Sequence, residues 1–367
     1  MKHFLTAIVM ISLTISSACT KASVSETPAQ RLAQRLLSIE NQGKVAFGHH
    51  DDTSYGHAWK YEANRSDVRD VCGDYPALMS WDLGLIEWNT EKQLDGVPFD
   101  FIRQEVAKQD ARGGINAFSW HLRNPITKGD SWDCEGGNVV AQCLTEGSAL
   151  NDTICAWIGR AADFIGSLRN KDGQRIAVIF RPWHEHTGSW FWWGYDHCSA
   201  DDYKALWKLT RRIFDQKGID NVLWAYSPDK DHFTGIKSYL ERYPGDDYVD
   251  IMGADVYHFG GQEGLDTYLQ NVKNMLGAAT LAAKEHHKLA AFTETGSEGI
   301  PMPNWWHEVL LPILKQYPVC YVTVWRNACD KPTHFYAPYK GHTSEESFKA
   351  FHADSATLFC KEINKIK

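Results

Sequence analysis

The 367-residue sequence has no excess of basic residues, because 38 Lys and Arg face 46 Asp and Glu and give a formal net charge of −8. A protein that holds nucleic acid through the phosphate backbone needs a positive field, so we expect no nucleic-acid partner. Beyond the first residues, the sequence also lacks an apolar run long enough to span a bilayer. It contains no linker or internal repeat that would divide it into two domains.

Several motifs of metal and cofactor chemistry are also missing. No CxxC pair, GxSxG turn or P-loop occurs, and no GxGxxG turn follows the first strand-like run. Residues 184–188, HEHTG, begin like an HExxH zinc helix, but Gly188 replaces the second histidine and Pro182 precedes the motif. The histidine pairs at 49–50 and 286–287 lack ligand-like companions, so a structural or sugar-binding role is favoured. We predict neither a metal site nor a cofactor.

The N-terminus has the features of an export signal. Residues 1–19 combine a basic start with an apolar run at positions 4–15, and small residues precede Cys19. We predict a lipoprotein signal in which Cys19 becomes the lipidated N-terminus, followed by a tether over 20–30; ordinary cleavage after Ala18 is the alternative. Lipidation predicts a bacterial envelope protein anchored to a membrane. Because no acidic cluster follows Cys19, a periplasm-facing orientation is favoured over the cell surface.

Eight cysteines remain after Cys19, and an even number in an exported protein permits disulfides. The pairs closest in sequence are Cys134 with Cys143 and Cys320 with Cys329. The pairing cannot be deduced from the sequence.

Short apolar runs rich in β-forming residues alternate with longer runs of helical periodicity. We expect strands within 44–50, 77–84, 115–122, 175–185, 221–229, 248–258, 289–296 and 320–328. We expect helices within 99–114, 154–170, 201–218, 268–286, 305–318 and 347–363. Eight repeats of strand and helix predict an α/β fold, a (β/α)8 TIM barrel in a single catalytic domain over 31–367, and a monomer. A doubly wound open sheet is the rival, disfavoured by the strand count and the missing glycine motif.

Chemistry-bearing residues gather where these strands end. In a (β/α)8 barrel the active site forms at the carboxyl ends of the strands. The long, weakly periodic loop 123–150 follows the third strand and is expected at the same face, where its two cysteines could brace it. Glu185 ends the fourth strand-like run and Glu294 the seventh, so their side chains can face each other across the barrel mouth.

Two facing carboxyl groups are the requirement for hydrolysing a glycosidic bond, one as proton donor and the other as nucleophile or base. Apolar rings near Glu185 would raise its pKa, and Arg181 would oppose that rise. Glu294 needs the ionised form, held by donors such as Tyr257 or Arg326. For a single glutamate at a strand end, a structural salt bridge is the stronger interpretation; two of them among many aromatic rings favour catalysis.

Aromatic side chains are unusually frequent, with 15 Trp, 15 Tyr and 16 Phe, and residues 181–194 alone read RPWHEHTGSWFWWG. Rings stack on the apolar faces of sugars while polar groups bind their edges. About half of the rings should be core residues. We expect Trp190 to face the sugar and Phe191 to face the protein.

These segments resemble glycoside hydrolase family 26, mainly its β-mannanases. The resemblance rests on FRPWHEHTGSWFWWG (180–194), DVYH (255–258), FTETG (292–296) and VTVWRN (322–327), in family order. It implies a (β/α)8 barrel, a retaining mechanism and no cofactor. The implied substrate is a β-1,4-mannan, glucomannan or galactomannan, or their oligosaccharides, cleaved in endo or exo mode. A β-1,3-xylanase or mixed-linkage glucanase of the same family remains an alternative, as does a non-catalytic glycan-binding lipoprotein.

The resemblance also implies roles for individual residues. Glu185 matches the catalytic acid/base and Glu294 the nucleophile. Residues 186 and 187, His and Thr here, depart from the Met and Asn common in the family, which leaves the leaving-group side of the cleft open. The expected substrate contacts are His121, Trp132, His184, Trp190, Tyr257 and Trp325, with Arg181, Asp255 and Arg326 as supporting residues.

Overall fold

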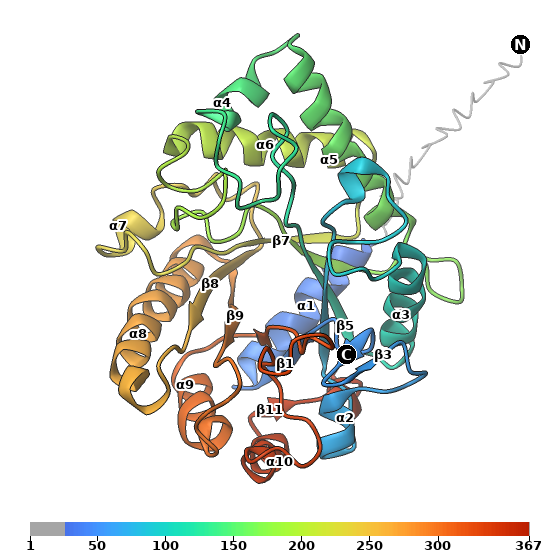
Figure 1. Cartoon of the computed structure of the whole chain (residues 1–367), viewed down its shortest axis with the longest axis vertical. Helices are drawn as coiled ribbons and strands as arrows, with labels where there is room; N and C mark the ends of the chain where they lie inside the picture. The colour runs from blue at the N-terminus through green and yellow to red at the C-terminus, as the bar shows by residue number, and fades with distance from the viewer. Residues whose placement is uncertain (1–25, 367) are drawn as a thin grey trace, which may run out of the picture.

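The computed structural model describes residues 26–366, and within them eight parallel strands close into a barrel (Figure 1). Closure is made by β1, which pairs with both β4 and β10: Gly48 lies opposite Leu78 on one side and Thr323 on the other. The barrel strands are β1 (Val45–His50), β4 (Leu78–Asp82), β5 (Ile115–Ser119), β6 (Val178–Arg181), β7 (Val222–Tyr226), β8 (Ile251–Tyr257), β9 (Leu289–Gly296) and β10 (Tyr321–Val324). Each predicted run contains one of them, so the predicted single-domain (β/α)8 barrel is confirmed.

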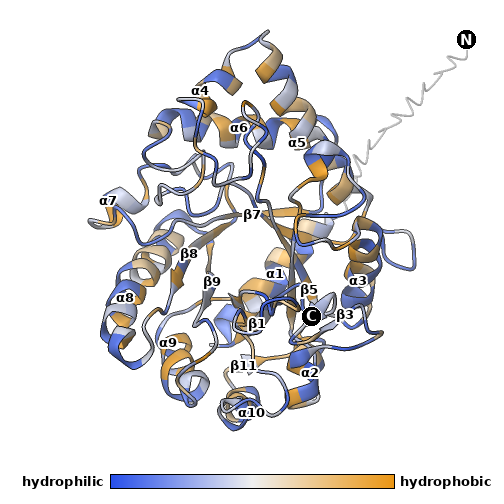
Figure 2. Ribbon diagram, in the orientation of Figure 1, coloured by the Kyte–Doolittle hydropathy of each residue, from blue (hydrophilic) through white to orange (hydrophobic). Residues whose placement is uncertain are grey.

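Helices surround the barrel, as the periodicity predicts. The larger ones are α1 (Pro28–Asn41), α3 (Phe99–Ala111), α5 (Ala149–Ser167), α6 (Ala200–Gln216), α8 (Gly261–His286) and α10 (Glu345–Ala353). A π-helical turn, η2 (Trp305–Leu310), continues directly into α9 (Leu311–Gln316). Helix α6 shows why these segments are helical: Ser199 caps its first turn, and its apolar residues share one buried face. The hydropathy colouring in Figure 2 shows both polar and apolar residues along the outer helices.

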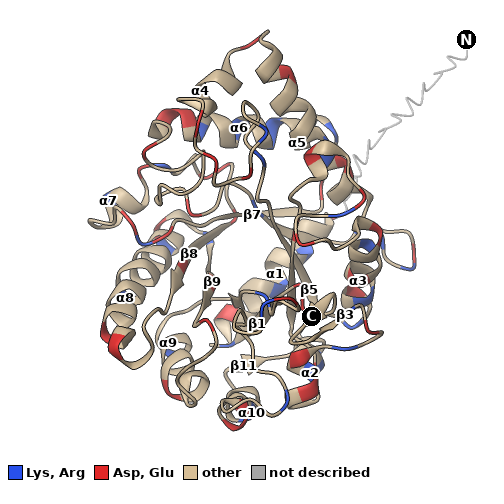
Figure 3. Ribbon diagram, in the orientation of Figure 1, with Lys and Arg blue, Asp and Glu red and all other residues tan. Residues whose placement is uncertain are grey.

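Several short elements lie between the barrel strands and the larger helices, and two of them, β11 and α11, replace part of the helix predicted within 347–363. They are β2 (Tyr55–Gly56), β3 (Trp59–Lys60), α2 (Asp67–Cys72), η1 (Ile86–Trp88), α4 (Val139–Leu144), α7 (Ile236–Tyr239), β11 (Thr357–Leu358) and α11 (Cys360–Ile363). Lys, Arg, Asp and Glu are distributed over helices and loops around the barrel (Figure 3).

The core has two parts. Small and aliphatic residues such as Ala46, Ala225 and Ala291 fill the barrel interior, and α1 contributes Leu36 and Ile39 to the same cluster. Because the Ala29 amide donates to the carbonyl of Asp220, just before β7, α1 covers the amino ends of the strands. The second, larger cluster lies between the strands and the outer helices. With the amino end closed by α1, the carboxyl end is left for a ligand.

Two predicted boundaries are wrong. The segment 347–363 is not one helix: α10 ends at Ala353, and β11 follows and pairs with β1 before α11 begins. The β-branched Thr357 donates its hydroxyl to the carbonyl of Phe351 at 2.6 Å, which ties off the helix end. At the N-terminus, α1 begins at Pro28, so residues 28–30 are helical rather than part of a tether.

The loop over 123–150 contains α4 and the first two residues of α5. All eight cysteines within the described residues are free, so no disulfide between Cys134 and Cys143 braces this loop. None of the helices within 26–366 is both long enough and apolar enough to cross a membrane. The predicted signal sequence and Cys19 lie outside the described residues.

Candidate active site

Glu185 is placed by a sharp turn at the end of β6. The predicted strand stops at Arg181, before Pro182, and both Trp183 and Glu185 take positive φ angles of 53°. The amide of Glu185 donates to the carbonyl of Ser227 at 2.8 Å, which joins the turn to the end of β7. Left-handed backbone at two non-glycine residues is costly and is typical of functional sites. The turn directs the carboxyl group of Glu185 into the cleft at the barrel mouth.

Glu294 lies within β9 and is held by a cation and a hydroxyl. Arg181 forms an ion pair with Glu294 Oε2, and the hydroxyl of Tyr257 donates to Oε1 at 2.5 Å. Only 6% of the surface of Glu294 is exposed. The prediction that Tyr257 holds Glu294 is confirmed. Arg326 does not perform this function, because its guanidinium pairs with Asp95 at 3.0 Å instead.

Asp255 lies beneath the two glutamates and shares Arg181 with Glu294. Its carboxylate accepts hydrogen bonds from Arg181 at 2.5 Å, from Ser227 at 2.7 Å and from Thr293 at 2.6 Å. Burial raises the pKa of Asp255 to about 7, against the opposing charge of Arg181. The guanidinium of Arg181 is therefore fixed by two carboxylates in one orientation.

Glu185 has the opposite surroundings. Burial, followed by the nearby carboxylates of Glu294, Asp255 and Asp229, raises the pKa of Glu185 well above its ordinary value. Arg181 opposes this rise, as predicted, but does not overcome it. The indole N–H of Trp190 donates to Glu185 Oε2 at 2.8 Å. The site thus combines a carboxyl group that keeps its proton with a carboxylate that is paired to a cation.

A chain of polar residues lies beside the glutamates. The side chain of His121 bonds Asp82 through Nδ1 at 2.6 Å, and its Nε2 lies 3.2 Å from Nε2 of His184. Burial alone would lower the pKa of His121, but the adjacent Asp82 carboxylate raises it. Burial and the charge of Arg181 lower the pKa of His184 well below its usual range. A neutral His184 next to a His121 that favours its charged form provides fixed hydrogen-bonding groups at the cleft wall.

The aromatic residues of 181–194 divide into packing and cleft residues. Trp183, Trp192 and Trp193 are buried, and their indole N–H groups donate to Thr210 Oγ1 and to the carbonyls of Leu122 and His184. Trp190 is half-buried and lines the cleft. A Cβ at Gly188 would lie 2.3 Å from the Trp190 ring, so only glycine leaves room for it there. Phe191 is 1% exposed and stacks on Trp193, and its edge also contributes to the cleft wall.

These side chains surround a cavity of about 440 Å³ at the barrel mouth. Trp325 forms one wall and stacks on His50, with ring centroids 4.2 Å apart. Trp132, on the long loop, is 60% exposed. The lining residues are His121, Trp132, His184, Glu185, Trp190, Phe191, Asp229, Lys230, Tyr257, Phe259, Glu294, Trp325, His334 and Tyr336. All eight residues predicted to act on or contact substrate are therefore brought together; Arg181 and Asp255 lie beneath them.

Arg326 lies in an adjoining cavity of about 370 Å³, which shares His121, Trp132, Trp325 and His334 with the first. The cleft therefore extends beyond the two glutamates on the side of Trp325.

Some cleft residues were missed from the sequence. Asp82 and Asp229 are recognisable from the sequence as polar residues at predicted strand ends, but no role was predicted for them. Phe259, His334 and Tyr336 come from loops after β8 and β10, and no periodicity marks them. His186 is buried between Tyr203 and Tyr226 and faces away from the cleft, which is why its difference from the family pattern does not alter the cavity.

Comparison with known proteins agrees with this geometry. Residues 22–332 match the sequence profile of glycosyl hydrolase family 26. The chain belongs to glycosyl hydrolase family 26. It is therefore a glycoside hydrolase, and the predicted family and enzyme class are confirmed.

Solved family 26 structures share the fold of this hydrolase. A GH26 β-mannanase from Bacteroides ovatus superposes with a TM-score of 0.89 and 47% identity, covering 93% of this chain and 98% of that one. A modular endo-β-1,4-mannanase from Cellulomonas fimi gives a TM-score of 0.80 and 32% identity, covering 92% and 77%.

Among curated sequences, the mannan endo-1,4-β-mannosidase of Bifidobacterium adolescentis is 29% identical over 362 residues, or 94% of this chain. This family 26 chain spans 36% of the length of that relative.

Proposed function

We propose that this glycoside hydrolase is a retaining mannan endo-1,4-β-mannosidase that cleaves β-mannosidic linkages in mannan, glucomannan or galactomannan. The observation that carries the proposal is the unequal pair of carboxyl groups in one cleft: Glu185 with a raised pKa, and Glu294 held by Arg181 and Tyr257. The relatives with matching sequence and fold, which carry the names β-mannanase or mannan endo-1,4-β-mannosidase, support the choice of substrate.

In the proposed first step, Glu294 attacks the anomeric carbon while Glu185 gives its proton to the departing glycosidic oxygen. The bond from carbon to that oxygen breaks, and a covalent mannosyl–enzyme forms through the Glu294 carboxylate. The ion pair with Arg181 holds the Glu294 carboxylate in position for the attack. The raised pKa of Glu185 keeps its proton available at neutral pH.

In the second step, the now ionised Glu185 takes a proton from water, and the resulting oxygen nucleophile attacks the same carbon. The ester to Glu294 breaks, and the sugar leaves with its original configuration because the carbon is inverted twice. NMR identification of the anomer that is released first tests this course of two inversions. A product of inverted configuration would contradict it.

Aromatic and polar residues of the cleft bind different parts of the substrate in this proposal. Trp190 and Trp325 offer flat surfaces for the apolar faces of sugars, and the exposed Trp132 extends this surface along the loop. In the proposed complex, His121 and His184 in the cleft wall bond hydroxyl groups next to the cleavage point.

Incubation of the purified chain with mannan, β-1,3-xylan and lichenan tests the substrate. We expect reducing-sugar release from mannan at least about tenfold above that from the other two, the discrimination typical of a shaped pocket. Faster release from xylan or lichenan would assign one of the other family activities. Binding of mannan without reducing-sugar release would assign a non-catalytic glycan-binding protein.

The mode of cleavage is tested on mannohexaose and on polymeric mannan. An endo-acting enzyme gives products of several lengths from the start and a rapid fall in viscosity. A single short product that accumulates from one end would establish exo action and point to the 123–150 loop as the blocking element.

We further propose that the chain is an envelope lipoprotein anchored through Cys19 and facing the periplasm, on the basis of the N-terminal sequence alone. A Cys19→Ala variant should appear in the soluble fraction after export. Labelling of the enzyme on intact cells by an antibody would contradict the periplasmic orientation.

A further inference from the structure

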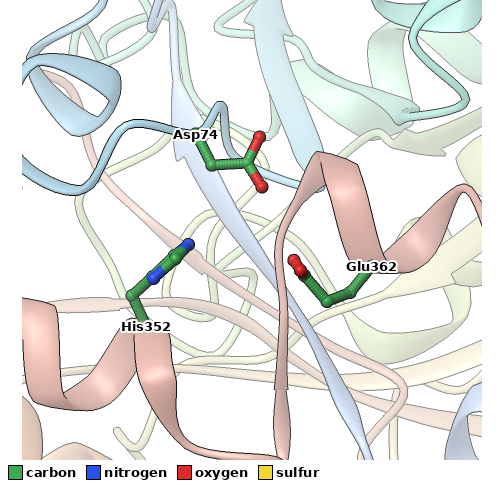
Figure 4. Close-up of side chains that lie close together, drawn as sticks. All are labelled: Asp74, His352 and Glu362. Carbon is green, nitrogen blue, oxygen red and sulfur yellow. The ribbon is translucent and has the colours of Figure 1, made fainter.

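Three metal-ligating side chains converge far from the cleft, near the amino ends of β1 and β4. Asp74 precedes β4, His352 lies in the last turn of α10, and Glu362 lies in α11 (Figure 4). One ligand atom from each of the three lies within 4.8 Å of the others. Figure 4 shows the three side chains pointing toward a common centre.

The backbone brings these segments together independently of the side chains. The amide of Cys360 donates to the carbonyl of Tyr75 at 3.0 Å, and Pro76 forms an antiparallel bridge with Phe359. The amide of Lys361 donates to Asp74 Oδ2 at 3.0 Å. The loop before β4 and the C-terminal segment therefore run side by side and hold the cluster in place.

Two of the three groups have no protein partner among the described residues. Nε2 of His352 is buried and makes no hydrogen bond, while the His352 ring packs edge-on against Phe359. The carboxylate of Glu362 takes part in no hydrogen bond or ion pair in this part of the chain. Asp74 is 3% exposed, and each of its oxygens accepts one amide, which leaves further lone pairs free. A buried nitrogen without a partner costs free energy unless a ligand meets it.

We propose that Asp74, His352 and Glu362 bind a divalent cation of the zinc class. Imidazole nitrogen favours Zn²⁺ over Ca²⁺ and Mg²⁺, which take oxygen ligands. An ion about 2.1 Å from each of three tetrahedral ligands would hold them about 3.4 Å apart, so the observed cluster needs side-chain shifts of roughly 1 Å. The two carboxylates balance the charge of the ion, and water takes the fourth position.

Such an ion would join the C-terminal segment to the loop before β4. The same segment carries β11, which pairs with Val45 and Ala46 of β1. The site thus serves stability at the closed end of the barrel and takes no part in hydrolysis.

A protonated His352 between two carboxylates is the competing arrangement, and it needs no ion. Zinc titration of the untagged, chelator-treated chain separates the two, with a chromophoric chelator as competitor and thermal unfolding as a second readout. Because the cleft also contains histidines, the decisive quantity is the difference between wild type and variants.

We expect His352→Gln and Glu362→Gln each to bind one zinc fewer per chain than the wild type. Zinc at about 100 times Kd should raise Tm of the wild type by about 3–5 °C and leave both variants unchanged. His286→Gln is the matched control, because His286 pairs with Asp246 at 2.7 Å on the surface and is in no three-ligand cluster within residues 26–366. Its zinc count should equal that of the wild type.

Equal zinc binding by the wild type and His352→Gln would overturn the proposal. So would a Tm of the wild type that zinc does not change, or one that Mg²⁺ raises as much. If Glu362→Gln fails to fold, His352→Gln carries the test alone.

Discussion

The surroundings of Glu185 and of Glu294 differ in almost every respect, although both residues border one cleft. Glu185 stands on a strained turn after β6, with the indole of Trp190 as its hydrogen-bonding neighbour and carboxylates nearby. Glu294 lies inside β9, where the register with β8 shifts by one residue, and it is paired with Arg181 and bonded by Tyr257. Two side chains of the same chemistry thus have different surroundings: those of Glu185 raise its pKa, and those of Glu294 supply a cationic partner.

The different properties of the two carboxyl groups depend on the residues that surround each of them. Arg181 is the decisive difference, because its two arms reach Glu294 and Asp255 and not Glu185. If this is right, each carboxyl group should respond differently to the same substitution.

The largest expected effects come from removing each carboxyl group. Glu294→Ala should lower kcat by about 10⁴-fold or more on every substrate, because the attacking atom is gone. Glu185→Ala should lower kcat on mannan by about 10²–10⁴-fold, the usual contribution of a general acid. Steady-state kinetics on mannan and on a mannoside with an activated phenol leaving group measure both.

The activated substrate sharpens the comparison, since its leaving group departs without a proton. Glu185→Ala should then show a burst of phenol followed by slow turnover, while Glu294→Ala shows no burst. Reversed behaviour would exchange the two roles. Circular dichroism of both variants checks that the fold is retained.

Arg181→Lys should have the next largest effect. A lysine cannot serve two carboxylates in a forked geometry, so one buried charge loses its partner. Breaking such a pair typically costs about 3–5 kcal/mol, which urea denaturation would measure.

Arg326→Lys provides the control, because Arg326 pairs with Asp95 in the adjoining cavity. It should lose less than half as much stability. Equal losses of stability in the two variants would mean that the two ion pairs of Arg181 contribute no more than the single ion pair of Arg326.

Replacing each glutamate by glutamine should change the free energy of unfolding in opposite directions at the two sites. Glu294→Gln should destabilise by about 1–3 kcal/mol, because Arg181 loses a charged partner. Glu185→Gln should stabilise by about 1 kcal/mol or more at pH 8.

The sign for Glu185 follows from its raised pKa. In the wild type, the unfolded state ionises above the ordinary pKa of 4.5 while the folded state keeps its proton. Stability present below pH 4.5 is therefore lost as pH rises toward the folded pKa, and the advantage of Glu185→Gln should grow from pH 5 to pH 8. Denaturation curves at both pH values measure this; a constant difference would contradict the raised pKa.

The smallest effects should come from removing one hydrogen bond on each side. Trp190→Phe removes the N–H that favours ionised Glu185, so the alkaline limb of the kcat profile should move upward by about 0.5–1 pH unit. Tyr257→Phe should lower kcat about tenfold and leave that limb in place. If both variants shift the alkaline limb of the kcat profile, the surroundings of Glu185 and Glu294 do not differ electrostatically in the way described.

Much of this architecture was predictable because its signals are local. Each barrel strand is a short apolar run, and the two glutamates stand where such runs end. The C-terminal segment was mispredicted because Phe348, Phe351 and Phe359 are spaced as on one helix, whereas tertiary pairing with β1 extends the chain between them.

The electrostatic partners were less predictable than the catalytic pair. Arg181 and Arg326 both follow apolar runs, and the sequence offers no reason to pair the first with Glu294 and the second with Asp95. Phe259 and Tyr336 enter the cleft from loops whose paths depend on the whole fold. Local patterns thus locate the site, and long-range packing determines which ion pairs its charged residues form.

The position of α1 has a consequence for orientation. Its first residues dock beside Asp220, at the amino ends of the strands, whereas the cleft opens at the carboxyl ends. A ligand therefore reaches the two glutamates from the side of the protein opposite the one at which the described chain enters α1.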